Sequence, residues 1–209
     1  ENYNTIYYVI ESPLEKGVIY TGSDCGLVYL TKDDGKTWSN ITPAGLPECM
    51  IHSIEVSPHD KATVYISASR YKFNDYGNMV YKSTDYGKSW TKSGVGIDAD
   101  DFIKVVREDK KIKGLLYAGA ERGFYVSYNN GMSWNKLQLN LPVVPVTDLI
   151  IHDNDLVAAT AGRAFWILDD LALIQQSKGN FSDALKIYQP KPTVRLTSFS
   201  PSWMEVPPG

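Results

Sequence analysis

The sequence lacks several features that would place it outside the ordinary globular proteins. It has 2 cysteines in 209 residues, which gives neither a disulfide framework nor a zinc-binding pattern. No run of about eighteen apolar residues occurs, so no membrane-spanning helix is expected. No signal peptide is visible either, and because the sequence opens on Glu1 without a methionine we expect it to be processed or truncated.

Strong charge of either sign is also missing. The formal net charge is −3 with a pI near 5.6, and no segment concentrates lysine or arginine. Polyanions are bound by basic patches or stripes. We therefore expect no nucleic-acid partner, while a single bound anionic sugar remains compatible with this charge.

Aromatic and turn-forming residues are abundant instead. The chain has 14 Tyr, 5 Trp and 6 Phe, together with 16 Gly and 11 Pro. Aromatic residues are enriched in strands, and Gly and Pro mark the turns between them. This composition favours an all-β protein. Helical periodicity is confined to "LALIQQS" at 171–177.

Three similar strings recur along the chain. They are "YLTKDDGKTW" at 29–38, "YKSTDYGKSW" at 81–90 and "YVSYNNGMSW" at 125–134. Each follows two runs of alternating or apolar residues, and a fourth pair of runs at 146–168 has no such string. Four short strands in roughly 40 to 50 residues is the period of a β-propeller blade.

The repeat predicts a β-propeller with four-stranded antiparallel blades. We expect about four blades within residues 1–177, at 5–42, 51–93, 102–138 and 146–174. Residues 178–209 are expected to be an extended linker or edge segment, because prolines recur there. Four blades are few for a ring, so we expect the remaining blades of the same propeller to lie outside this chain.

Each repeated string is predicted to be a structural turn. An Asp carboxylate can accept hydrogen bonds from its own turn, and the following Gly can adopt a left-handed conformation. The Trp is expected to fold back over the turn and cover the outer edge of its blade. The residues given this role are Asp33, Gly35, Trp38, Asp85, Gly87, Trp90, Asn129, Gly131 and Trp134.

The strings fit S/T-x-D-x-G-x-S/T-W, with Asn129 in place of Asp in the third. They resemble the Asp-box, or bacterial neuraminidase repeat. From residue 5 to about 177 the chain is similar to the last blades of large bacterial sortilin-like propellers, often labelled glycosyl hydrolases. It departs from them at Ala161, where His is usual, and at Cys49. The resemblance implies an extracytoplasmic protein: periplasmic, secreted or on the cell surface.

Ligand sites in propellers usually lie near the axis, beside the loops that join the second strand to the third and one blade to the next. On that side we expect Arg70, Arg122 and Arg163, which occupy corresponding strand ends. Three guanidinium groups could grip the carboxylate of an acidic sugar. The neighbouring candidate residues are Asp24, Tyr71, Tyr76 and Glu121. The alternative is that each arginine pairs with an acidic residue of a neighbouring blade and helps to hold the turn between the second and third strands.

Two functions remain open from the sequence. The first is a module that binds or scaffolds a protein or glycan, since no complete set of catalytic groups is present. The second is a sialidase-like glycoside hydrolase whose other catalytic residues lie in further blades. No catalytic residue, cofactor or metal site is assigned. Cys25 and Cys49 are expected on the same side, either as a disulfide or as two reduced thiols.

Overall fold

The computed structural model describes residues 4–179 and 185–190, so most of the segment 178–209 lies outside the described residues. Its strands form four antiparallel sheets. Sheet 1 contains β1 (Ile6–Glu11), β2 (Ile19–Ser23), β3 (Val28–Thr31) and β4 (Ser39–Asn40). Sheet 2 contains β5 (Met50–Val56), β6 (Val64–Arg70), β7 (Asp75–Ser83) and β8 (Thr91–Ser93).

The second half repeats the arrangement. Sheet 3 contains β9 (Ile103–Glu108), β10 (Leu116–Ala120), β11 (Phe124–Ser127) and β12 (Asn135–Lys136). Sheet 4 contains β13 (Val146–His152), β14 (Asp155–Thr160) and β15 (Phe165–Leu168). A short 3₁₀ helix, η1 (Tyr71–Phe73), lies between β6 and β7, and α1 (Ala172–Ser177) follows β15.

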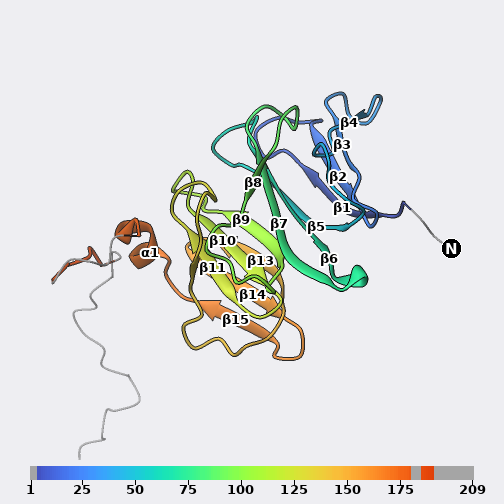
Figure 1. Ribbon diagram of the computed structural model, residues 1–209. Helices are drawn as coiled ribbons and strands as arrows, with labels where there is room; N and C mark the ends of the chain where they lie inside the picture. The colour runs from blue at the N-terminus through green and yellow to red at the C-terminus, as the bar shows by residue number, and fades with distance from the viewer. Residues whose placement is uncertain (1–3, 180–184, 191–209) are drawn as a thin grey trace, which may run out of the picture.

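The sheets follow one another as blades around an axis. Figure 1 shows them in chain order as an open arc, with β1–β4 at one end and β13–β15 at the other. Contacts join β1 to β5, β5 to β9 and β9 to β13, so the first strand of each sheet lies innermost. The predicted all-β propeller is confirmed. No described helix is long and apolar enough to cross a bilayer.

Sheet 4 differs from the prediction because it has three described strands. It has no repeated string after β15. Instead, Asp170 adopts a left-handed conformation with φ 58° and its Oδ1 accepts a hydrogen bond from the backbone N–H of Ala172. The chain then enters α1, whose Ile174 packs against sheet 4. The helix expected at 171–177 is therefore present where the other blades have a fourth strand.

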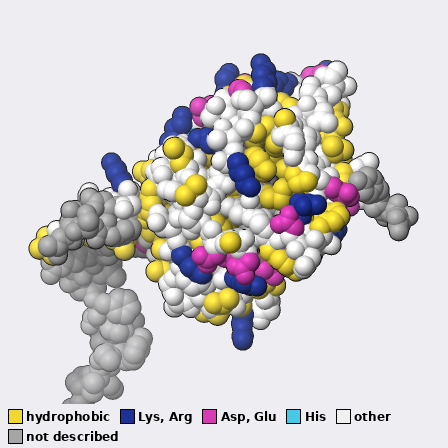
Figure 2. All heavy atoms as spheres, in the orientation of Figure 1, with side chains coloured by type: hydrophobic (Ala, Val, Ile, Leu, Met, Phe, Trp, Pro, Cys, Tyr) yellow, Lys and Arg dark blue, Asp and Glu magenta, His cyan; other side chains and the backbone are white. Residues whose placement is uncertain are grey.

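Hydrophobic side chains fill the spaces between consecutive sheets. Three clusters of buried residues form the core, and each contains residues of two neighbouring sheets. The central strand β6 is buried along nearly its whole length, because both faces of sheet 2 are covered. Its polar residues Ser67 and Ser69 are buried as well, and Ser67 Oγ donates to the backbone carbonyl of Lys104 in sheet 3 at 2.9 Å. On the face in view in Figure 2, acidic and basic side chains are interspersed, with hydrophobic side chains exposed between them.

Each repeated string forms a closed turn around its Asp or Asn. In the second, Asp85 Oδ1 accepts hydrogen bonds from Ser83 Oγ at 2.7 Å and from the Ser89 backbone N–H at 2.9 Å. Hydrogen bonds from Ser89, chiefly from its hydroxyl, lower the pKa of Asp85 to about 2. Gly87 has φ 83°, where a Cβ would be strained. Asn129 closes the third turn, accepting through Oδ1 and donating through Nδ2 to Ser133.

The tryptophans of these turns fold back as predicted, and two of them have a further role. Each indole lies against the Gly of its own turn. Trp90 Nε1 also donates to the backbone carbonyl of Ile41 in the connection after sheet 1, at 2.7 Å. Trp134 Nε1 donates to Ser93 Oγ in sheet 2, at 3.2 Å. These two indoles therefore join their blade to the preceding one, whereas Trp38 bonds to Gly35 in its own turn.

Both cysteines are free thiols in the structure. Cys25 is half-buried, and its thiol donates to Asn4 Oδ1 at 2.6 Å. Cys49 is buried, and burial raises the pKa of its thiol to about 12. A thiol with such a raised pKa is a poor nucleophile at neutral pH.

Candidate binding site at the propeller axis

The innermost strand of every sheet contains a β-bulge at the same place. In β1, Ile6 pairs with Ser23 and Tyr8 with Gly22, so one residue on β1 has no partner on β2. The same register shift occurs in β5, β9 and β13. The four extra residues are Tyr7, His52, Lys104 and Thr147. A bulge re-aims a side chain relative to the regular pleat.

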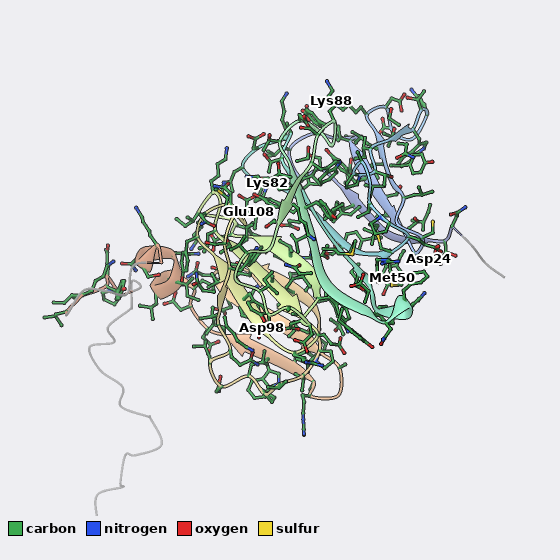
Figure 3. All side chains as sticks on the ribbon, in the orientation of Figure 1. Asp24, Met50, Lys82, Lys88, Asp98 and Glu108 are labelled. Atoms are coloured by element: carbon green, nitrogen blue, oxygen red, sulfur yellow. The ribbon has the colours of Figure 1, made fainter. Side chains whose placement is uncertain are left out.

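All four bulge residues line one cavity, which we call the axial pocket. Its volume is about 470 Å³, and the remaining lining residues are Met50, Tyr71, Tyr76, Phe102 and Glu121. This volume falls within the range of small-molecule sites, roughly 300 to 1,000 Å³. In Figure 3, Met50 lies near Asp24 at one end of the sheets, whereas Lys82 and Glu108 lie toward the opposite end.

Aromatic rings form the floor and walls of the axial pocket. Phe102 is buried and stacks on Tyr71, with ring centroids 5.8 Å apart and planes 9° apart. His52 stacks on the same phenylalanine at 5.7 Å. Tyr76 lies 6.4 Å from it, and Tyr7 meets His52 edge-on. Since Tyr7, Tyr71 and Tyr76 are 53%, 39% and 43% exposed, the pocket offers accessible ring surface.

One ion pair supplies the charge in the axial pocket. Lys104 Nζ lies 2.6 Å from Glu121 Oε2 and 5.6 Å from the centre of the Phe102 ring. His52 bonds through Nε2 to Ser69 Oγ at 2.7 Å. Burial, together with the nearby lysines, lowers the pKa of His52 to about 4. His52 is therefore neutral at pH 7. The axial pocket combines uncharged aromatic rings with one ion pair, between Lys104 and Glu121, whose two charges cancel.

The three predicted arginines lie outside the axial pocket. Arg70 pairs with Asp75 in its own sheet at 2.9 Å. Arg122 pairs with Asp100, which lies in the loop before β9. Arg163 is exposed in the β14–β15 loop. Two of the three thus form local ion pairs, with acids of their own sheet or of the loop that leads into it, and not with acids of a neighbouring blade.

The other candidate residues divide in the same way. Tyr71, Tyr76 and Glu121 line the axial pocket, as expected for loops on this side of the propeller. Asp24 instead accepts a hydrogen bond from the backbone N–H of Thr5 at 2.9 Å and so fixes the start of the first blade. The described residues contain no group of three or more His, Cys, Asp or Glu side chains suited to a metal ion.

Sequence reasoning missed most of the pocket. None of Tyr7, His52, Phe102 and Lys104 was singled out from the sequence. The signal was present in the repeat, because each bulge residue directly follows a β-branched apolar residue at or near the start of its strand. The pairs are Ile6–Tyr7, Ile51–His52, Ile103–Lys104 and Val146–Thr147.

The opposite mouth of the axis has a different character. A cavity of about 230 Å³ is lined there by apolar side chains and by Glu11, Glu55, Arg107, Glu108 and Lys110. Glu55 Oε1 accepts the backbone N–H of Glu108 at 3.0 Å, and Arg107 lies 3.7 Å from its other oxygen. Glu55, Arg107 and Glu108 are thus engaged in contacts between sheets 2 and 3, so we interpret this end of the axis as structural.

Comparison with known proteins relates the chain to other propellers. No protein-family model matches it. The xyloglucanase Xgh74A of Acetivibrio thermocellus is 25% identical over 144 residues, which cover 62% of this chain and 17% of the enzyme. The GH74 xyloglucanase of Xanthomonas campestris has 16% identity and a TM-score of 0.61, covering 78% of this chain and 29% of that one.

A second kind of propeller is similar to the same degree. YCF48 from Cyanidioschyzon merolae has 13% identity and a TM-score of 0.59, covering 80% of this chain and 53% of that one. YCF48 has also been solved bound to D1 peptide. The chain thus spans less than a third of the xyloglucanases and about half of YCF48. These likenesses show a partial β-propeller related in fold to glycoside hydrolases, while the narrower resemblance to sortilin-like proteins stays a prediction.

Proposed function

We propose that this protein is an extracytoplasmic propeller module that binds carbohydrate in the axial pocket. The observation that carries the proposal is the alignment of four β-bulges, which direct a side chain from every sheet into one aromatic cavity. Bulges concentrate next to functional sites because they re-aim side chains at a cost in regular pairing. Four at one register position indicate a built site.

The pocket suits the chemistry of a sugar ring. The flat C–H face of a pyranose packs well on an aromatic ring, and Tyr71 and Tyr76 present partly exposed rings. Sugar hydroxyls require donors and acceptors, which the tyrosine hydroxyls, Lys104 and Glu121 provide. Because the one lysine of the pocket is already paired with the one carboxylate, we expect a neutral sugar rather than an anionic one. The xyloglucanase relatives give independent support for a glycan ligand.

Binding is better supported than hydrolysis. Glycoside hydrolases generally use two carboxyl groups placed on either side of the scissile bond. Among the residues that line the axial pocket, Glu121 is the one carboxylate, and it is held by Lys104. A glycoside hydrolase remains the second candidate, since the chain spans 17% of the xyloglucanase Xgh74A and further carboxylates could come from other blades. A sialidase-like site would additionally need arginines in the pocket.

The pocket tyrosines provide the test. We expect Tyr71→Ala and Tyr76→Ala each to weaken binding of xyloglucan or cello-oligosaccharides at least tenfold in calorimetric titrations, through loss of stacking area. Phe73→Ala is the matched control, because Phe73 is an exposed ring of η1 that does not line the pocket. Equal affinities in all variants would remove the pocket from carbohydrate binding.

Two further measurements separate the rival functions. Release of reducing ends from the same oligosaccharides would favour the hydrolase. Binding of peptides but not sugars, with the same dependence on Tyr71 and Tyr76, would favour a protein partner of the kind that YCF48 has. Fractionation of the producing cell tests the extracytoplasmic location, which a purely cytosolic protein would contradict.

A further inference from the structure

Two buried serines of sheet 2 contact the bulge that presents Lys104 to the axial pocket. Ser53 in β5 and Ser67 in β6 are paired across the sheet, and they are 2% and 0% exposed. Ser67 Oγ donates to the backbone carbonyl of Lys104 in sheet 3 at 2.9 Å. A buried hydroxyl costs stability unless it is hydrogen-bonded, so what these serines bond to explains why they are there.

The hydrogen bonds of the two serines run in one direction. Since Ser67 donates its single hydroxyl proton to the Lys104 carbonyl, Ser53 is the donor in the 2.8 Å bond between the two hydroxyls. Ser53 Oγ in turn accepts the backbone N–H of Val106 at 3.3 Å. This chain of bonds begins and ends on β9, and we call Ser53 and Ser67 the serine bridge.

The serine bridge satisfies the backbone where the regular strand pairing is broken. Ile103 pairs with Ala120 and Val105 pairs with Gly119, so Lys104 has no partner on β10. The extra residue of a bulge is left out of the ladder, and a buried carbonyl without a donor is costly. The bridge supplies that donor from the neighbouring sheet and holds β9 at both sides of the bulge.

In sheets 1 and 3 the position that matches Ser67 is a glycine. The strand register places Gly22 and Gly119 there. A Cβ at these glycines would lie 2.5 Å from Ile51 and from Val146 of the following sheet, so that sheet approaches too closely for any side chain. Among the described sheets, a side-chain donor at this position therefore belongs to the contact between sheets 2 and 3.

The bulge that receives this bond is also the one with a charged side chain. Tyr7 and Thr147 are uncharged, and His52 is neutral at pH 7 because its pKa is lowered to about 4. Lys104 pairs with Glu121 at 2.6 Å and supplies the positive charge of the axial pocket. A fixed backbone at this bulge thus matters for where that charge lies.

We propose that the serine bridge positions Lys104 in the axial pocket, with Ser67 as the positioning residue. The inference rests on the proposed function, since it assumes that the Lys104 ammonium donates to a hydroxyl of the bound sugar. A donor that is held in place before the ligand arrives loses less conformational freedom on binding, which raises affinity. Ser67 acts through Lys104 and does not itself line the pocket.

Substitutions that copy sheet 3 remove the serine bridge with little change of shape. Sheet 3 has Val105 and Gly119 where sheet 2 has the two serines. Ser53→Val with Ser67→Gly, the bridge variant, should therefore fold. It should weaken binding of cello-oligosaccharides about tenfold in calorimetric titrations, because Lys104 must then be ordered on binding. Ser53→Thr has the shape of valine at this position but keeps both hydroxyls of the bridge, so its affinity should equal that of the wild type.

A spectroscopic signal separates positioning from general stability. Lys104 Nζ lies 5.6 Å from the centre of the Phe102 ring, so the NMR resonance of Lys104 Cε senses that ring. With isotope-labelled lysine, and with the resonance assigned through Lys104→Met, the bridge variant should shift this signal and Ser53→Thr should not. Ser93→Ala is the control for stability, because Ser93 bonds to Trp134 across the same two sheets from the outermost strand of sheet 2. It should change neither the resonance nor the affinity.

The outcomes distinguish this inference from the proposed function. If the unmodified protein binds no sugar, the proposed function fails, whereas a shifted Lys104 resonance in the bridge variant still supports positioning. An unchanged resonance overturns the inference, and so does an unchanged affinity in a protein that binds sugar. Effects of Ser93→Ala as large as those of the bridge variant would also overturn it, because the serines would then only stabilise the fold.

Discussion

At the scale of single residues, Arg107 joins three of the four sheets through two ion pairs. Arg107 in sheet 3 lies against Glu55 of sheet 2 and pairs with Asp148 of sheet 4 at 2.7 Å. Its Nε also donates to the backbone carbonyl of Leu149 at 2.8 Å. Burial raises the pKa of Glu55 to about 7, despite the opposing effect of Arg107. A charged Glu55 therefore costs stability in the folded protein.

This raised pKa predicts a pH dependence that a glutamine should remove. The folded state holds the Glu55 proton more tightly than the unfolded state, whose pKa is near 4.5. The resulting stability is complete below pH 4.5 and is lost as the pH rises through about 7. Glu55→Gln keeps an acceptor for the Glu108 N–H and cannot ionise. Relative to wild type, it should gain on the order of 3 kcal/mol between these pH values.

Urea unfolding of both proteins at matched pH values measures this difference. The pH-dependent contributions of groups present in both proteins cancel in the difference between their unfolding free energies. A pH-independent loss of attraction between residue 55 and Arg107 shifts that difference by the same amount at every pH. A difference in unfolding free energy that is flat from pH 4.5 to 7 would contradict the raised pKa.

At the scale of elements, the repeated turn connects blades as well as closing one. Its Asp or Asn fastens the turn, while its Trp reaches the preceding blade when a blade is there. Ile41 and Ser93, the acceptor residues, each lie three positions after the Trp of their own blade. The sequence alone predicted the first role, because Asp, Gly and the hydroxyl residues are local. It missed the second, which depends on how two sheets pack.

Paired substitutions should separate the two roles. Trp90→Phe removes the bond from Nε1 to the Ile41 carbonyl and should cost about 1 kcal/mol of unfolding free energy. Trp38→Phe removes a bond within an exposed turn and should cost less than about 0.5 kcal/mol. Chemical denaturation of both variants and the wild type measures the two costs. Equal costs would mean that the indole acts only within its own turn.

At the scale of the whole molecule, the sequence repeat was enough to predict the fold but only part of the lining of the axial pocket. Sequence topology placed Tyr71, Tyr76 and Glu121 at the mouth where the axial pocket lies, because loop order follows from strand order. His52 and Lys104 were not found, since the alternation within one strand does not reveal a bulge and the shared position is seen only when the first strands of the sheets are aligned. The expected arginine cluster rested on matching register, but side chains as long as Arg70 and Arg122 bond to the nearest acid.

The arrangement of sheets also sets where the molecule opens first. Sheets 2 and 3 are covered on both faces, whereas sheets 1 and 4 are each covered on one. Local opening costs less where fewer apolar contacts must be broken. Hydrogen exchange should therefore be faster in β2 and β14 than in β6 and β10, which hold the same second position in their sheets.

The difference in exchange follows from packing alone. β6 and β10 lie in sheets with a neighbouring sheet on each side, so their backbone hydrogen bonds open only when two interfaces between sheets are disrupted. Uniform protection across β2, β6, β10 and β14 would contradict the unequal burial of the four sheets.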